Sequence, residues 1–265
     1  MILKKLERRL LVFTILLGGF LSTLTETILN NALPTIMEAF NISQSVSQWL
    51  STGYILVVGI MMPTAAYFFN RVPLKPLFIT TLFIFLIGTI IASTAKNFEF
   101  LMLGRIVQAV SVGISMPLVQ NVLTLVYPPN ERGAALGLAA IVIILGPAIG
   151  PTLSGWIVNH YPWEWIFIIL IPITVLVIVL SFFTVKNINQ TKPTKLSWLS
   201  LMLSTMGFGL LLYGFSNIGI IAGINIPTTI ILVIGLLTTI GFIVLQLKLK
   251  NPLLEMRVFK SPSFT

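Results

Sequence analysis

The sequence predicts an all-α membrane protein that crosses a bilayer about eight times. Hydrophobic residues make up 56% of the 265 residues and charged residues only 9%, whereas a soluble domain is usually about a quarter charged. The mean hydropathy is +1.01, and the apolar residues gather in runs of about 20, the length that a helix needs to span the hydrocarbon. Such a chain cannot cover its apolar surface in water, so we expect lipid to surround it.

Each apolar run is long enough for one membrane helix, and turn or polar residues separate the runs. One such separator, Tyr127–Asn130, is predicted as a loop because it contains two prolines in sequence. The first run has a basic start, like a signal peptide, but it is longer than an h-region and no cleavage site of small residues follows it, so we expect it to be retained. The predicted spans are Leu10–Asn30, Val46–Phe69, Leu77–Ala95, Phe98–Leu125, Ala134–Val158, Trp165–Phe183, Leu199–Ile218 and Pro227–Leu247.

The distribution of basic residues predicts the orientation. All but two of the 16 Lys and Arg residues lie in the N-terminal segment, in the loops after the second, fourth and sixth runs, or in the C-terminal tail. Lys96 falls on the opposite side, and Arg105 lies inside a span. Because Lys and Arg are enriched on the cytoplasmic side of membrane proteins, we expect a multi-pass protein of the cell membrane with both termini of the chain in the cytoplasm.

The composition excludes several kinds of functional site. The chain has no cysteine and one histidine, His160, and it has no aspartate. A disulfide framework, a thiolate metal site and a Ser/His/Asp triad are therefore ruled out. The net charge of +9 is divided among loops rather than collected on one face with aromatic residues, so it does not favour nucleic-acid binding. We expect no cofactor, no metal and no enzymatic activity.

Two charged residues lie well inside predicted spans, where a charge costs about 2.5–3.5 kcal/mol on insertion scales. At 1.5 Å per residue, Glu26 lies about 7 Å below the outer end of the first span, and Arg105 about 10 Å below the same surface. One interpretation is a static ion pair, or side chains that reach the interface. The other, which we favour, is a carboxylate that exchanges a proton beside an arginine, since burial favours the protonated acid and the guanidinium favours the ionised one.

The fifth span contains two Gly-Pro steps, Gly146-Pro147 and Gly150-Pro151, followed by Gly155. Proline removes a backbone donor and bends a helix, and glycines four residues apart allow a neighbouring backbone to approach closely. Ordinary helix packing explains part of this pattern. Two such steps in one span also predict a bend on which movement depends.

Several segments together resemble the major facilitator superfamily, in particular its fourteen-helix drug:proton antiporters of the EmrB/QacA type. Thr27–Pro34 is similar to the end of that family's first-helix motif, and Gly104–Ala109 resembles its fourth-helix R-x-x-Q-G motif. Gly146–Gly155 resembles the antiporter motif of the fifth helix, the most specific of the set. Trp163–Phe167 with the following Pro172 resembles the family's W-R-W-I-F…P-I segment.

The resemblance implies a proton-coupled multidrug exporter of amphiphilic, often cationic compounds, without a cofactor. Glu26 would be the coupling acid with Arg105 as its partner, although the family's acid aligns with Thr25, one residue or about 100° of helix away. Asn70, which replaces a family acid, Arg71 and Lys75 would form a cytoplasmic gate. The hinge would be Gly146, Pro147, Gly150, Pro151 and Gly155, and possible cavity-lining residues are Asn30, Trp49, Tyr54, Gln108 and Gln120.

The resemblance also implies a domain organisation. Residues 1–185 would form the N-terminal six-helix bundle, 186–198 a cytoplasmic linker, 199–248 an additional pair of membrane helices, and 249–265 a lead-in to a second bundle that the chain does not contain. The implied partners are drug-like molecules, protons, the bilayer and that second half. Three alternatives stay open: an exporter of one specific solute, a sodium-coupled antiporter, and a fragment or assembly partner that transports nothing.

Overall fold

The computed structural model describes residues 4–191, 197–221 and 225–249, and throughout these ranges the regular structure is helical. The predicted lead-in therefore lies outside the described residues from position 250 onward, as does the middle of the predicted linker, 192–196. The helices are α1 (Lys5–Ile28), η1 (Asn30–Ala32), α2 (Leu33–Phe40), α3 (Gln44–Ser47), α4 (Trp49–Arg71), α5 (Leu74–Ser93), α6 (Phe98–Val126), α7 (Pro129–His160), α8 (Trp165–Ile168), α9 (Leu170–Thr184), α10 (Trp198–Ile221) and α11 (Ile226–Lys248).

Eight helical segments of the described chain are long and apolar enough to cross a membrane, which confirms the predicted number. Two predicted boundaries were wrong. The first segment does not end at Asn30 but continues through η1 and α2 to Phe40, with Pro34 in the first turn of α2, where its missing N–H is not needed. The loop predicted at Tyr127–Asn130 is shortened for the same reason, because Pro129 is the first residue of α7.

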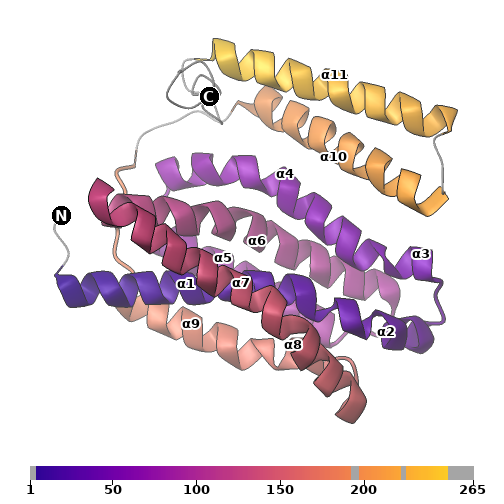
Figure 1. The fold of residues 1–265 in the computed structure, drawn as a ribbon, viewed down its shortest axis with the longest axis horizontal. Helices are drawn as coiled ribbons and strands as arrows, with labels where there is room; N and C mark the ends of the chain where they lie inside the picture. Colours follow the sequence, from indigo (N-terminus) through magenta and orange to yellow (C-terminus); the bar gives the residue numbers. More distant parts are fainter. Residues whose placement is uncertain (1–3, 192–196, 222–224, 250–265) are drawn as a thin grey trace.

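The helices form one bundle with a further pair at its side (Figure 1). α5 and α6 pack along each other, α4 packs on α6, and α7 packs along α1. α10 and α11 pack along each other, and α10 packs on α4, on the opposite side of the bundle from α9. This arrangement places α1, α4, α5 and α6 around one buried centre.

A close contact between glycines sets the distance between α5 and α6. A Cβ atom at Gly104 would lie 2.7 Å from the backbone nitrogen of Ala92, and one at Gly88 would lie 2.6 Å from the backbone nitrogen of Gln108. Small residues allow helix backbones in a membrane to approach in this way. The contact holds the turn of α6 that carries Arg105 and Gln108 directly against α5.

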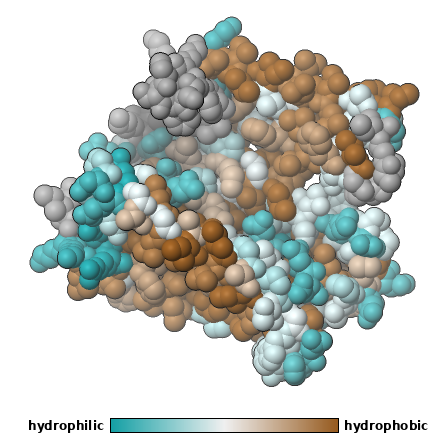
Figure 2. All heavy atoms as spheres, in the orientation of Figure 1, coloured by the Kyte–Doolittle hydropathy of each residue, from teal (hydrophilic) through white to brown (hydrophobic). Residues whose placement is uncertain are grey.

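The surface fits a membrane environment. Hydrophilic residues gather near the start of α1 and near the ends of α2 and α7, and hydrophobic residues cover the region between and the outer face of the α10–α11 pair (Figure 2). Large apolar side chains are exposed on several helices, among them Ile144 of α7, Phe183 of α9 and Leu237 of α11. A soluble monomer rarely exposes contiguous apolar surface of this extent, so lipid is the expected neighbour.

Two ion pairs in the described part of the chain tie the start of α1 to other elements at the same end. Lys186 Nζ lies 2.8 Å from Glu7 Oε1, and Arg8 Nη1 lies 3.2 Å from Glu131 Oε2 at the start of α7. The Arg8 guanidinium also lies over the ring of Tyr127, 4.6 Å from its centroid. The start of α1 is thus connected to both α7 and the segment after α9.

Candidate functional site

Arg105 lies at the buried centre of the bundle. It is fully buried on α6, and its guanidinium donates to backbone carbonyls of two other helices. Nη1 is 3.1 Å from the carbonyl oxygen of Thr25 on α1, and Nε is 3.4 Å from that of Leu50 on α4. The positive charge is therefore solvated by backbone dipoles, which is one of the ways in which a charge is accommodated within a membrane protein.

Two residues singled out in the sequence complete this cluster. The Arg105 guanidinium stacks on the ring of Tyr54, 3.8 Å from its centroid, and Nη1 donates to Gln108 Oε1 at 3.1 Å. Gln108 Nε2 in turn donates to Thr89 Oγ1 on α5 at 2.9 Å. Thr89 was not predicted as a site residue, because a lone threonine in an apolar run gives no distinctive signal. The cluster thus joins α1, α4, α5 and α6.

Two polar atoms in the cluster have no hydrogen-bond partner among the residues that the structure describes. They are Arg105 Nη2 and the Tyr54 hydroxyl, and both atoms are buried. A buried polar group without a partner costs about 1–3 kcal/mol, and more when it is charged. Arg105 Nη2 and the Tyr54 hydroxyl can therefore donate to a further acceptor, such as a water molecule or a carboxylate.

Glu26 lies at the level of Arg105 but forms no salt bridge with it. The bond from Arg105 to the carbonyl of Thr25 places the two charged residues at the same level of the bundle. No nitrogen–oxygen pair of Glu26 and Arg105 lies within 4.0 Å, so the static ion pair that the sequence left open is not formed. The Glu26 side chain is half-buried and makes no hydrogen bond with any other residue that the structure describes. Thr25, by contrast, is fully buried.

The Gly-Pro run of α7 faces α1, and α7 passes through it as one uninterrupted helix. A Cβ atom at Gly146 would lie 2.7 Å from the backbone nitrogen of Leu24, and one at Gly150 would collide with the hydroxyl of Thr27. Asn31 Nδ2 donates to the carbonyl oxygen of Pro151 at 2.9 Å. The run therefore forms the contact between α7 and the helix that carries Glu26.

The predicted gate residues lie at the α4–α5 connection. Asn70 and Arg71 are exposed, and the Arg71 guanidinium is 5.9 Å from the ring centroid of Tyr67. Lys75 Nζ donates to the carbonyl oxygen of Phe182 at the end of α9, 2.6 Å away. These residues thus connect α4, α5 and α9 at one end of the bundle.

Two asparagines after α9 reinforce this connection and were not predicted. Asn189 Oδ1 accepts from the backbone nitrogen of Leu74 at 2.8 Å, and its Nδ2 donates to the carbonyl oxygen of Val72 at 2.9 Å. Asn187 Oδ1 accepts from the backbone nitrogen of Lys75 at 2.9 Å. Polar residues in a linker are too common for the sequence to single these out.

The five possible cavity-lining residues do not share one environment. Tyr54 and Gln108 are fully buried in the Arg105 cluster, whereas Asn30 and Gln120 are exposed. Trp49 is half-buried, and its ring lies 5.8 Å from that of Tyr213 on α10. Tyr54 and Gln108 therefore organise the arginine rather than line an open space.

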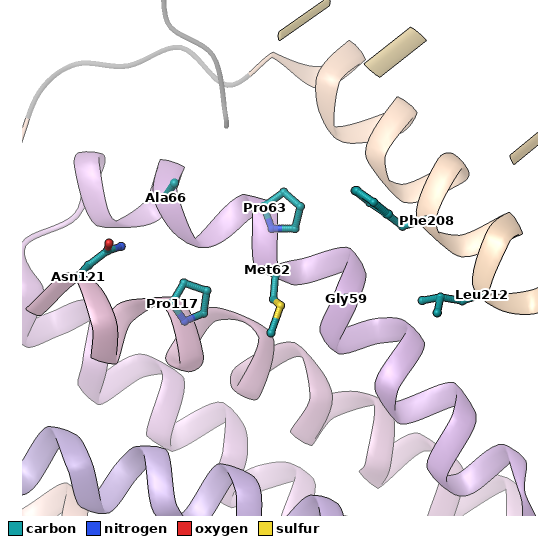
Figure 3. A pocket seen from close by; sticks show the side chains of 8 residues that line it. All are labelled: Gly59, Met62, Pro63, Ala66, Pro117, Asn121, Phe208 and Leu212. Atoms are coloured by element: carbon teal, nitrogen blue, oxygen red, sulfur yellow. The ribbon is translucent and has the colours of Figure 1, made fainter. Parts of the chain in front are cut away.

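An open cavity of about 550 Å³ lies elsewhere, between α4, α6 and α10 (Figure 3). Its walls are mostly apolar, and none of the residues predicted to line a cavity contributes to it. The sequence could not predict it because α10 supplies one wall, and the packing partner of α10 is a tertiary property. The lining residues are Gly59, Met62, Pro63, Ala66, Pro117, Asn121, Phe208 and Leu212.

A family profile and individual relatives of the chain point to the same protein family. The sequence profile described as Major Facilitator Superfamily matches residues 15–253. The chain is 41% identical to the uncharacterized MFS-type transporter YcnB of Bacillus subtilis over 97% of its own length and 54% of that protein. It is 41% identical to the lincomycin resistance protein LmrB of the same organism, over 96% of the chain and 53% of LmrB. The chain thus spans about half the length of these curated relatives.

Two further comparisons widen the range of relatives. The riboflavin transporter RibZ of Clostridioides difficile is 32% identical over 98% of this chain and 56% of RibZ. Among solved structures, that of the peptide transporter POT (E310Q mutant) in complex with sulfate matches with a TM-score of 0.66 at 15% identity, over 90% of this chain and 52% of that one. The structural similarity concerns the fold.

Proposed function

The chain belongs to the major facilitator superfamily of transporters, and from that premise we propose that it is the N-terminal part of a proton-coupled exporter of amphiphilic, often cationic compounds. The name of LmrB, a resistance protein, supports drug export. The observation that carries the proposal is the buried Arg105 cluster, in which a positive charge without an ion pair lies at the level of a half-buried carboxylate, Glu26.

In the proposed mechanism Glu26 exchanges the proton and Arg105 stays in place. Arg105 is held by carbonyls of α1 and α4 and by Gln108, so its charge is a fixed feature of the bundle. A fixed positive charge stabilises the ionised carboxylate, and exclusion of water from Glu26 in a closed state stabilises the protonated acid. Alternation between an open and a closed state therefore loads and releases one proton at Glu26.

Export requires more than this bundle. Substrate sites of this fold lie between two bundles, and the relatives are about twice as long as the chain. We propose that a second bundle, in the same polypeptide or a separate one, completes the transport path, and that α10 and α11 are an additional pair outside the two bundles. The alternative is that this chain is an assembly partner or a fragment that transports nothing. In that case no second bundle completes a transport path with it.

A second candidate function is transport of one specific solute. The name of RibZ, a riboflavin transporter, supports it, and the shift of the acid from the family's position at Thr25 to Glu26 also leaves sodium coupling open. The two candidates differ in substrate range, because a multidrug exporter accepts chemically unrelated amphiphiles, whereas a specific transporter discriminates among them.

The deciding experiment is transport by the purified protein, together with its second bundle, in vesicles with an imposed gradient. We expect a pH gradient, and not a sodium gradient, to drive accumulation of both lincomycin and ethidium. Accumulation of riboflavin alone would support the specific transporter, and dependence on sodium alone would replace the proton as the coupling ion. No accumulation of any of the three under either gradient would contradict the proposed function.

The orientation is a further part of the proposal, and the absence of cysteine makes it easy to test. Ser43, Asn159 and Arg132 are all exposed. In intact cells, a membrane-impermeant maleimide should label Ser43→Cys and Asn159→Cys, whereas Arg132→Cys should react only after permeabilisation, because basic residues favour the cytoplasmic side. Labelling of Arg132→Cys in intact cells would reverse the orientation.

A further inference from the structure

The cavity between α4, α6 and α10 has the size of a ligand site. Its volume of about 550 Å³ falls within the range of about 300–1,000 Å³ that is typical of small-molecule pockets. It is open to the surface, since the lining residues Met62 and Leu212 are 42% and 36% exposed. α4, α6 and α10 each form a membrane-spanning segment, so the cavity lies within the apolar part of the molecule.

Two features place polar groups without hydrogen-bond partners in this apolar cavity. The backbone carbonyl of Asn121 accepts from Thr124, but the Asn121 side-chain amide has no hydrogen-bond partner in the described part of the chain. Pro63 lies inside α4 and has no N–H to donate to the carbonyl of Gly59, four residues earlier. In hydrocarbon, polar groups without partners cost several kcal/mol. A ligand with one hydroxyl group would supply the missing partner.

We propose that this cavity binds a neutral amphiphile, with an apolar body and a single hydroxyl group, which enters from the membrane. Phe208 and Leu212 extend from α10 toward α4, where Pro63 lies, and Met62 points from α4 toward α6 (Figure 3). These side chains contact the apolar body. The ligand is neutral because the lining residues include no acid or base. The inference concerns binding and stands apart from the proposed proton coupling, whose residues lie in the Arg105 cluster.

The test is photolabelling of the purified protein in nanodiscs with 4-hydroxybenzophenone, a neutral apolar molecule with one hydroxyl group. We expect label at Met62 in excess of label at Met202, which is 60% exposed on α10 but is not among the cavity residues. Gly59→Leu should reduce the label at Met62 about five-fold or more by filling the space, since a Cβ atom there meets only Leu212, at 3.6 Å. The matched control is Gly241→Leu, where a Cβ atom has no heavy atom within 4 Å.

A second variant tests the hydrogen bond to the Asn121 side chain without filling the cavity. Asn121→Leu replaces the side chain with one of similar volume. It should lower labelling by 4-hydroxybenzophenone about 3- to 10-fold, the loss of affinity that corresponds to one hydrogen bond. Labelling by unsubstituted benzophenone should be unchanged. Equal label at Met62 and Met202 in the unmodified protein would overturn the proposal, as would label at Met62 that neither Gly59→Leu nor Asn121→Leu changes.

Discussion

Replacing Gly146 with leucine is expected to abolish export, and the same replacement at Gly137 of the same helix is expected to leave it intact. A Cβ atom at Gly146 would lie 2.7 Å from the backbone nitrogen of Leu24 and 2.9 Å from the carbonyl carbon of Thr23. Backbone atoms cannot move aside as a flexible side chain can, so α7 must separate from α1. At Gly137 a Cβ atom meets nothing within 4 Å.

The size of the effect depends on what the new side chain meets. Overpacking a helix contact costs about 1–3 kcal/mol, and more where backbones collide. Gly150→Leu should be less damaging to thermal stability than Gly146→Leu, because the nearest backbone atom to a Cβ at Gly150 is the nitrogen of Ile28 at 3.3 Å, compared with 2.7 Å to Leu24 at Gly146. It should still abolish export. The measurements are lincomycin efflux from cells, membrane abundance by immunoblot and melting temperature in detergent. Normal efflux by both Gly146→Leu and Gly150→Leu would show that the Gly-Pro run is incidental to transport.

The membrane helices follow from the sequence, because the length and hydropathy of each run determine whether it can span a bilayer. All eight were predicted in this way. The extension of the first segment to Phe40 was missed because Pro34 looks like a helix terminator, although at the second position of a helix it is compatible with one. What a proline does depends on where the helix starts, and hydropathy gives that position only approximately.

The site was predictable only in part. Arg105 and Gln108 are three residues apart and share one face of α6, and the cost of a buried charge identifies the arginine. Tyr54 was expected in a cavity wall and instead stacks on Arg105, since no local pattern indicates that α4 presents it to α6. Thr89 could not be recognised because a threonine in a helix commonly bonds to its own backbone, as Thr89 also does with Phe85.

The apolar cavity could not be predicted from the sequence, for a different reason. Pro63, Pro117 and Asn121 were visible as irregular residues in apolar runs, but what they face depends on α10, which packs beside α4 although about 130 residues separate them. Such contacts between distant segments are set by the fit of whole helices, not by local periodicity. Function that depends on the position of Arg105 is therefore easier to anticipate than function that depends on α10.

Glu26→Gln is expected to remove export driven by a pH gradient while leaving the protein folded. Glutamine keeps the shape of the side chain but cannot exchange a proton, and Glu26 is half-buried without an ion pair to Arg105, so the change breaks no contact that holds the bundle together. Transport into vesicles under an imposed pH gradient should fall to the rate of vesicles without protein. Binding of a neutral substrate should persist, which separates loss of coupling from loss of structure, and Glu26→Asp should retain partial transport.

The position of the acid supplies the control. Thr25 is fully buried, and its carbonyl accepts the Arg105 bond, whereas Glu26 lies about 100° further round the helix. In Thr25→Asp combined with Glu26→Thr, the acid is at the position of the family motif, where burial beside a fixed guanidinium favours a permanently ionised carboxylate. We expect this double variant to bind substrate and to transport more slowly than the unmodified protein, because the acid releases its proton but regains it with difficulty. Full pH-driven transport by Glu26→Gln would place the coupling acid elsewhere and remove the main mechanistic claim.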